Sequence, residues 1–222
     1  MEQQAKRYKI GVFDSGRGGK SVAVALEAAL PEHDIVFVSD EANIPYGSRT
    51  EHELQLLVLP KLRQLEAAGC VVIVIACNTA STTVLPWLRG RIATPLIGVE
   101  PMVSQAVVAT KSQKIAICAT PTTLASQRYK QLKSQAPSTV TFYEPDCSDW
   151  AYLIESNQIN RDKIAKTITP TISQSADVVV LGCTHYHWIE QEIKDICGRD
   201  VLVLQPEKLI IEEVQGVLAR LT

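Results

Sequence analysis

Residues 71–75 read Val-Val-Ile-Val-Ile, an uninterrupted run of five β-branched residues. Such a run favours a strand buried on both faces, as in a parallel sheet covered by helices. The run is followed by a thiol, an amide and hydroxyls, at Cys77, Asn78, Thr79 and Ser81. Open α/β sheets bind ligands at the carboxyl ends of their strands. The sequence therefore predicts that the Cys77 thiol lies at the binding edge of such a sheet.

The same pattern returns about one hundred residues later, where Asp177-Val-Val-Val-Leu-Gly leads into Cys183-Thr-His. Three pairs of strand positions keep nearly one separation: Ile10 and Ile115 (105 residues), Phe37 and Phe142 (105), and Cys77 and Cys183 (106). Expected strands and helices also alternate along the chain, which favours parallel sheets. We therefore expect an α/β fold of two similar domains. Each is a mainly parallel sheet flanked by helices, and an approximate two-fold axis relates them.

The domain boundary is expected where the pattern starts again. We place the first domain at residues 1–97 and the second at residues 98–205. The last helix, within residues 206–222, is expected to pack back on the first domain. Within the second domain, apolar spacing predicts helices over residues 124–134 and 188–197.

Composition and charge exclude several classes of protein. The formal net charge is −2, so bulk electrostatics favour neither nucleic acid nor an anionic membrane. There is no apolar run of the roughly 18 residues that a membrane span needs, and no apolar signal-peptide core. The six cysteines contain no Cys-x-x-Cys pair, which argues against a structural zinc site, and a chain of this length without an export signal rarely carries a disulfide framework. We expect a cytoplasmic protein.

Two thiols at equivalent strand ends suggest a particular chemistry. If the two domains face a common cleft, Cys77 and Cys183 approach one ligand from opposite sides. Inversion at a carbon needs this arrangement, because one group removes a proton while another returns it on the opposite face. A free thiol has a pKa of about 8.5, and a helix N-terminus lowers it. Thiols can therefore serve as acid or base near neutral pH.

Four motifs in this order resemble those of the glutamate racemases, in the cofactor-independent aspartate/glutamate racemase family: Asp14-Ser-Gly-Arg-Gly-Gly19, Pro45-Tyr-Gly47, Ala76-Cys-Asn-Thr-Ala-Ser81 and Leu181-Gly-Cys-Thr-His-Tyr186. The resemblance implies interconversion of L- and D-glutamate, the latter for peptidoglycan synthesis. It implies no cofactor and no metal, a small-molecule substrate, and a homodimer as a common assembly.

The resemblance also assigns roles to residues. Cys77 and Cys183 match the two catalytic acid/bases, Asp14 and His185 match residues that assist the thiols, and Glu155 matches a glutamate that supports His185. The positions that match substrate-binding residues are Asp14, Ser15, Tyr46, Gly47, Asn78, Thr79, Thr184 and His185. The sequence departs from the family pattern in several places, including Gln205-Pro206, where the last strand usually ends in Asp-Ser, and a shorter C-terminus. Arg17 stands where a small or branched apolar residue is usual, and Ala119-Thr-Pro-Thr-Thr123 replaces a Gly-Thr turn.

Other interpretations stay open at this point. Asp14 can serve only as the N-cap of the helix that begins near Lys20. His185 can be a turn histidine and Glu155 a solvated helix residue. The substrate can be aspartate or a related amino acid, or the chain can be a two-lobed protein that binds a small molecule without catalysis. Only a catalyst needs both thiols.

Overall fold

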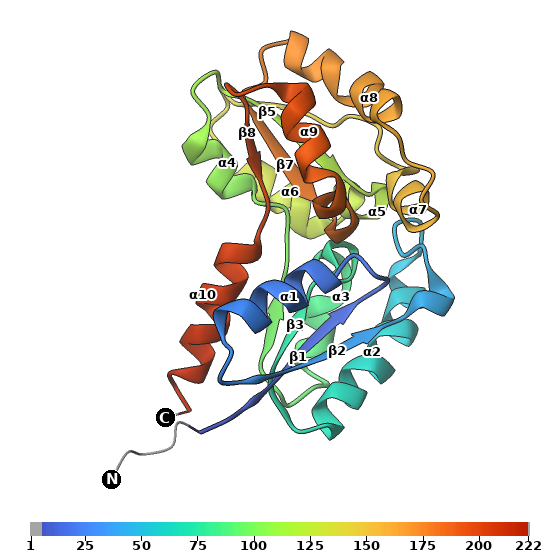
Figure 1. Ribbon diagram of the computed structural model, residues 1–222, viewed down its shortest axis with the longest axis vertical. Helices are drawn as coiled ribbons and strands as arrows, with labels where there is room; N and C mark the ends of the chain where they lie inside the picture. Colours follow the sequence, from blue (N-terminus) through green and yellow to red (C-terminus); the bar gives the residue numbers. More distant parts are fainter. Residues whose placement is uncertain (1–5, 222) are drawn as a thin grey trace.

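The computed structural model describes residues 6–221, which form two four-stranded sheets with parallel strands throughout. The first sheet has the order β2-β1-β3-β4 and the second the order β6-β5-β7-β8. The strands are β1 (Lys9–Asp14), β2 (Asp34–Ser39), β3 (Cys70–Ile75), β4 (Leu96–Gly98), β5 (Lys114–Ala119), β6 (Thr141–Tyr143), β7 (Val178–Gly182) and β8 (Leu202–Leu204). Each half thus repeats one topology, and the predicted α/β fold is confirmed (Figure 1).

Helices cover both faces of each sheet. In the first half, α1 (Lys20–Ala29) and α10 (Glu207–Leu218) lie on one face, and α2 (Glu51–Ala67) and α3 (Asn78–Arg89) on the other. In the second half, one face carries α4 (Val103–Ala109), α5 (Pro121–Ala125) and α6 (Gln127–Ser134). The opposite face carries α7 (Trp150–Glu155), α8 (Arg161–Ser173), the 3₁₀ helix η2 (Thr184–Ile189) and α9 (Glu190–Cys197). A short 3₁₀ helix, η1 (Glu41–Asn43), follows β2.

The uninterrupted apolar run occupies the centre of this arrangement. In β3, Val72 and Val74 face the core beneath α1 and α10, whereas Ile73 and Ile75 face the core beneath α2 and α3. All four side chains are fully buried. Because both faces are covered, no position of the strand requires a polar residue. Within residues 6–221, no helix is long and apolar enough to cross a membrane.

The two halves exchange their last helices. After β4, the chain crosses to the second half, where Val103 and Ala106 of α4 pack against that sheet. After β8, it crosses back to the first half (Figure 1). There, Val214 of α10 packs against the first sheet. The boundary expected between residues 97 and 98 falls inside β4. The division at these residues stays a prediction, and the ends of the predicted ranges, residues 1–5 and 222, lie outside the described residues.

Strand register corrects one of the three spacings seen in the sequence. Ile10 lies beside Ile35 in β2, whereas Ile115 lies beside Phe142 in β6. Phe37 is therefore displaced by two residues from the position equivalent to Phe142. The 105-residue spacing of Phe37 and Phe142 reflects only the apolar character of both strands, and the two residues do not occupy equivalent positions.

Two helix predictions in the second half were wrong in their limits. Residues 121–134 form two helices, because Ser126 adopts an extended conformation and its hydroxyl accepts a hydrogen bond from Tyr129 N at 3.2 Å. Such a hydroxyl is a favourable N-cap, which starts a new helix. The helix expected from residue 188 begins at Glu190, because the preceding turn, η2, is a 3₁₀ helix. Apolar spacing does not distinguish these cases.

The carboxyl ends of both sheets meet between the two halves. The Thr184 hydroxyl, after β7, donates to Asp14 Oδ1, at the end of β1, at 3.1 Å. The hydroxyls of Thr79, after β3, and Thr120, after β5, lie 2.9 Å apart. The edges where α/β sheets bind ligands therefore face each other.

Candidate active site

Cys77 lies where β3 passes into α3. It is the N-cap residue of this helix, and its Sγ accepts from Ala80 N at 3.5 Å. The side chain is almost fully buried. A helix N-terminus favours a thiolate, but here burial and the nearby Asp14 carboxylate raise the pKa of Cys77 to about 12. Desolvation is the larger effect, so Cys77 is a protonated thiol at neutral pH.

Cys183 lies at the equivalent strand end but has different neighbours. Its Sγ is 3.6 Å from Nδ1 of His185, and Nε2 of the same ring is 3.1 Å from Glu155 Oε1. An ionised carboxylate only accepts, so Nε2 carries a proton and Nδ1 faces the sulfur. A neutral ring accepts the S–H proton at Nδ1, and the resulting imidazolium donates to a thiolate. The arrangement suits a sulfur that alternates between acid and base.

Opposing effects determine the charges of His185 and Glu155. Burial alone would lower the pKa of His185, but its hydrogen bonds with Cys183 and Glu155 raise that pKa to about 10. The bond to His185, helped by bonds from Arg17, lowers the pKa of Glu155 to about 2 against the effect of its burial. At neutral pH the pair is therefore an imidazolium and a carboxylate.

The pH dependence of stability tests this ion pair. A pKa of His185 raised from 6.5 to about 10 stabilises the folded protein below pH 6.5, and this contribution is lost as pH rises toward 10. Glu155, with its lowered pKa, contributes above about pH 4.5 and loses its contribution as pH falls toward 2. Glu155→Gln should therefore cost at least about 1 kcal/mol more at pH 6 than at pH 9.5, because the raised pKa of His185 contributes fully to stability at pH 6 and has lost most of this contribution at pH 9.5.

Urea unfolding of both proteins at the two pH values measures this difference. Glu144→Gln is the matched control, because Glu144 accepts from Lys133 and Tyr129, away from any histidine. Its cost should be the same at both pH values. If Glu155→Gln lowers the free energy of unfolding by the same amount at both pH values, the contact with Glu155 does not raise the pKa of His185.

Asp14 lies at the end of β1, near Cys77 and His185, and is fully buried. Its Oδ2 accepts from the backbone N–H groups of Gly16 at 3.1 Å and Gly19 at 3.0 Å, and its Oδ1 accepts from Thr184. Burial raises the pKa of Asp14. The carboxylate thus holds the loop before α1 and joins it to the second half. Gly19 is the N-cap residue of α1, so Asp14 orders this loop as well as the start of the helix.

One cavity brings most of the predicted residues together. It is lined from the first half by Ser15, Ile44, Pro45, Tyr46, Gly47, Cys77, Asn78 and Thr79, and from the second half by Thr120, Ala151, Cys183, Thr184 and His185. Both cysteines line it, whereas Asp14 and Glu155 do not. Its volume is about 20 Å³, which is room for a single water molecule. The two halves are therefore closed over the thiols.

Polar groups on the cavity wall are available for a ligand. Both side-chain polar atoms of Asn78 are buried without a hydrogen-bond partner. Leaving such groups unpaired costs roughly 1–3 kcal/mol, so a ligand that pairs them recovers this free energy. The hydroxyls of Thr79, Thr120 and Thr123 form a buried cluster with separations of 2.9 to 3.3 Å. By contrast, the Tyr46 hydroxyl donates to Asp40 at 2.7 Å, so this residue offers the cavity its other atoms.

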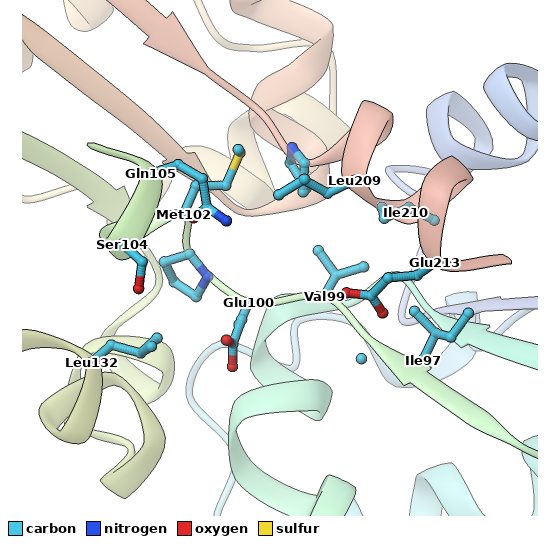
Figure 2. A pocket seen from close by; sticks show the side chains of 13 residues that line it. Ile97, Val99, Glu100, Met102, Ser104, Gln105, Leu132, Leu209, Ile210 and Glu213 are labelled. Carbon is cyan, nitrogen blue, oxygen red and sulfur yellow. The ribbon is translucent and has the colours of Figure 1, made fainter. Parts of the chain in front are cut away.

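Two larger pockets lack this chemistry. A pocket of about 110 Å³ lies beside the two segments that connect the halves. Val99, Glu100, Leu209 and Glu213 are among the residues that line it (Figure 2). An adjoining pocket of about 720 Å³ lies between α3 and α6. Neither contains a cysteine or a histidine. Size alone would favour them, but the groups that can move a proton converge on the smaller cavity.

The residues of the site that the sequence did not predict include the polar residues Thr120 and Arg17, beside Ile44, Pro45 and Ala151 on the cavity wall. Thr120 lines the cavity, and the hydroxyl-rich turn after β5 was a usable signal, because β5 occupies the place in its sheet that β1 has in the other. Arg17 contacts Glu155 from the opposite half through three hydrogen bonds. Its sequence position beside Asp14 gave no indication of this partner.

The fold and the site together define a two-lobed α/β protein with a thiol from each lobe at one closed cavity. Comparison with known proteins gives the family. Residues 20–214 match the family described as Asp/Glu/Hydantoin racemase, and the chain belongs to this family. The glutamate racemase of Herpetosiphon aurantiacus is 34% identical over 218 residues, covering 96% of this chain and 86% of that protein.

Solved structures show the same similarity. Escherichia coli glutamate racemase, in complex with L-glutamate and the activator UDP-MurNAc-Ala, has a TM-score of 0.89 at 25% identity, over 96% of this chain and 83% of that one. The glutamate racemase of Francisella tularensis, in complex with D-glutamate, has a TM-score of 0.81 at 26% identity, over 96% and 81% of the two chains. The recognition made from the four motifs is confirmed.

Proposed function

We propose that this chain interconverts L- and D-glutamate by proton transfer between two cysteines, without a cofactor. The observation that carries the proposal is the position of Cys77 and Cys183, which line one cavity from opposite halves. The named relatives, which are glutamate racemases, support glutamate as the substrate. Both thiols at one cavity favour catalysis over simple binding, since a binding protein needs neither.

Each cysteine is proposed to act on one face of the substrate α-carbon. A Cys183 thiolate, paired with the His185 imidazolium, removes the α-proton on its side, so that the C–H bond breaks and an S–H bond forms. The Cys77 thiol then donates its proton to the opposite face, forming the new C–H bond and leaving a thiolate. The reverse reaction exchanges the two roles. The high pKa of Cys77 suits it to begin as the acid in the first direction.

The remaining residues are proposed to hold the substrate and its negative charge. The Asn78 amide, the backbone N–H groups at the start of α3 and the hydroxyls of Thr79 and Thr184 can hold carboxylates. Donors already fixed in place also stabilise the charge that develops at the α-carbon. Ser15, Tyr46 and Gly47 complete the wall. The Asp14 charge favours the protonated form of Cys77, and direct contact between Asp14 and the substrate stays a prediction.

Substrate entry requires the cavity to enlarge. Glutamate has ten non-hydrogen atoms, which do not fit in about 20 Å³. The wall is divided between the two halves, so relative movement of the halves would open it. A site that closes over its substrate also excludes water, which strengthens every electrostatic interaction within it.

A racemisation assay tests the proposal. The purified protein should convert L-glutamate to an equal mixture of enantiomers, as followed by chiral chromatography, and should act on aspartate much more slowly. Racemisation of aspartate or another amino acid in preference to glutamate would support the alternative substrate. Binding of glutamate by calorimetry with no conversion of either enantiomer would identify a binding protein instead.

Three further predictions extend this function. The family resemblance predicts that the D-glutamate serves peptidoglycan synthesis, so the gene should restore growth to a bacterium that requires D-glutamate. All six cysteines are free thiols, which supports a location in the reducing cytoplasm. The homodimer stays a prediction that light scattering can test.

A further inference from the structure

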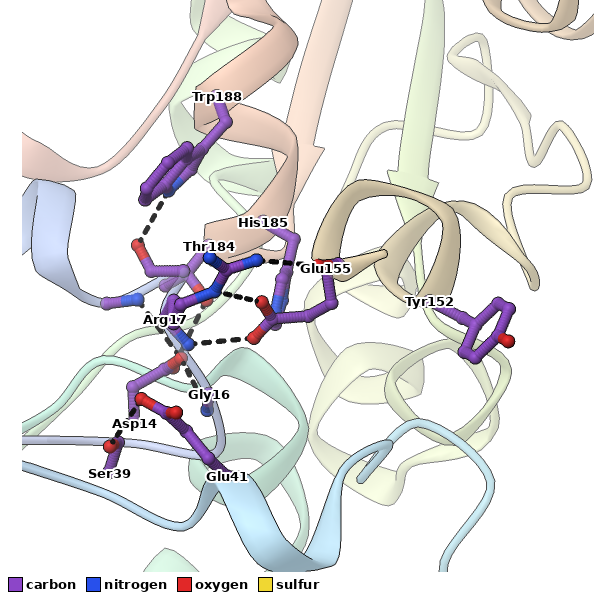
Figure 3. A network of polar contacts seen from close by, with 12 residues as sticks. Asp14, Gly16, Arg17, Ser39, Glu41, Tyr152, Glu155, Thr184, His185 and Trp188 are labelled. Atoms are coloured by element: carbon purple, nitrogen blue, oxygen red, sulfur yellow. Dashed lines mark hydrogen bonds and ion pairs between the residues drawn. The ribbon is translucent and has the colours of Figure 1, made fainter. Parts of the chain in front are cut away.

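Arg17 connects the first half of the protein to Glu155 in the second. Its backbone N–H donates to Glu155 Oε1 at 2.9 Å, its Nε donates to Oε2 at 2.6 Å, and its Nη2 donates to the Glu155 carbonyl oxygen at 2.6 Å (Figure 3). Arg17 comes from the loop between β1 and α1, whereas Glu155 is the last residue of α7. One residue therefore binds both the side chain and the backbone of the other.

A chain of contacts links Glu155 to the Cys183 thiol through His185. The oxygen that accepts from the Arg17 backbone, Oε1, is also 3.1 Å from His185 Nε2. His185 in turn faces Cys183 Sγ at 3.6 Å. Arg17 does not line the cavity, so any effect that it has on the reaction passes through Glu155.

The geometry restricts Glu155 to one orientation. Each carboxylate oxygen has its own donor from Arg17, and the bond to the carbonyl fixes the backbone of the same residue. A planar guanidinium can bind two acceptors at once, whereas the point charge of a lysine cannot reproduce this pattern. Gly16 packs so closely that a Cβ on it would lie 2.4 Å from Glu155 Oε1. The carboxylate thus has little freedom to leave His185.

On the basis of the proposed racemase function, we propose that Arg17 is a positioning residue that holds Glu155 against His185 and thereby supports proton transfer at Cys183. With the guanidinium removed, Oε2 of Glu155 loses its donor, and only the backbone N–H of residue 17 and the His185 ring hold the carboxylate, both at Oε1, so that it can turn toward solvent. His185 then loses its carboxylate partner for part of the time. The thiolate of Cys183 loses an imidazolium neighbour to the same extent.

Several other groups also influence His185. The titratable and charged groups that face it are Asp14 at the end of β1, Cys183 after β7, Glu155 of α7 and His187 of η2, with Arg17 beyond Glu155. Asp14, Cys183 and Glu155 favour the imidazolium, and Arg17 keeps one of these three in place. The test must therefore observe His185 itself as well as the activity.

Arg17→Met and Arg17→Lys form the test, with Arg128→Met as the matched control. Arg128 forms a two-bonded ion pair with Glu100, at 2.6 and 2.8 Å, away from the cavity. NMR of ring-labelled protein follows the titration of His185, whose signal is identified by its absence from His185→Gln. Arg17→Met should lower the pKa of His185 by one unit or more and lower kcat about tenfold, with KM changed less than threefold. The pKa of His185 and the kcat of Arg17→Lys should lie between those of Arg17→Met and the unaltered protein. Both values in Arg128→Met should match those of the unaltered protein.

Two results would overturn the proposal. One is a titration of His185 in Arg17→Met that matches the unaltered protein, whatever the activity. The other is a raised KM with unchanged kcat, which would place Arg17 in substrate binding. Circular dichroism melting confirms that each variant is folded. The titration needs no turnover, so it decides the role of Arg17 even if the unaltered protein does not racemise glutamate, which is a failure of the proposed function alone.

Discussion

Cys77→Ser and Cys183→Ser should each lower kcat for racemisation by about 1,000-fold or more, in both directions. A serine hydroxyl is far less acidic than a thiol, so it neither holds the charge of a base nor releases a proton at neutral pH. Because every conversion uses one cysteine as base and the other as acid, the loss of either blocks both directions. Chiral chromatography of the products from each enantiomer measures the effect.

Substrate binding separates a chemical defect from a structural one. Neither sulfur is required to hold a carboxylate, so calorimetry should find glutamate bound within a few-fold of the affinity of the unaltered protein. Cys197→Ser is the matched control, because Cys197 is equally buried but lies at the end of α9. It should retain nearly full activity. More than a tenth of the activity in either Cys77→Ser or Cys183→Ser would contradict the assigned roles.

His185→Gln should lower kcat by about 100-fold or more, the usual size of an acid–base contribution. A glutamine amide can keep hydrogen bonds to Glu155 and toward Cys183, but it cannot carry a positive charge. The Cys183 thiolate then loses the cation that stabilises it, while Cys77 keeps its own surroundings. Steady-state kinetics with both enantiomers, at several pH values, measures the change.

His187→Gln is the matched control for this substitution. His187 lies two residues further along η2, and the burial of its side chain lowers its pKa to about 4, so it is neutral near pH 7. Its Nδ1 contacts the Ser21 hydroxyl at 3.2 Å, outside the cavity. Its replacement should change kcat less than threefold. An equal loss in both variants would mean that packing of η2, rather than charge at residue 185, determines the activity.

Local patterns in the sequence predicted much of this architecture. The run at residues 71–75 is a strand because only a fully covered strand tolerates five consecutive β-branched residues. The 106-residue spacing of Cys77 and Cys183 reported real equivalence, since each follows the third strand in the order of its sheet. The spacing of Phe37 and Phe142 did not, because apolar residues recur in every strand.

The contacts between the halves could not be predicted in the same way. Thr120 reaches the cavity only because β5 and β3 end at the same place, and this follows from the packing of two sheets. Arg17 and Glu155 are 138 residues apart and share no local pattern. The role of Asp14 in assisting the thiols stays a prediction, but its contact with Thr184, 170 residues away, is likewise a product of the packing of the two halves. Sequence motifs can indicate such residues, but which of them are in contact depends on the fold.

Solvent deuterium at the α-carbon tests the two-cysteine mechanism most directly. The unaltered protein is given L-glutamate in deuterated buffer, and both enantiomers are analysed by NMR and mass spectrometry at low conversion. If one cysteine removes the proton and the other supplies its own, the D-glutamate formed carries deuterium while the remaining L-glutamate keeps its proton. D-glutamate that retains the original proton, or L-glutamate that gains deuterium as fast as product forms, would contradict proton transfer by two separate thiols.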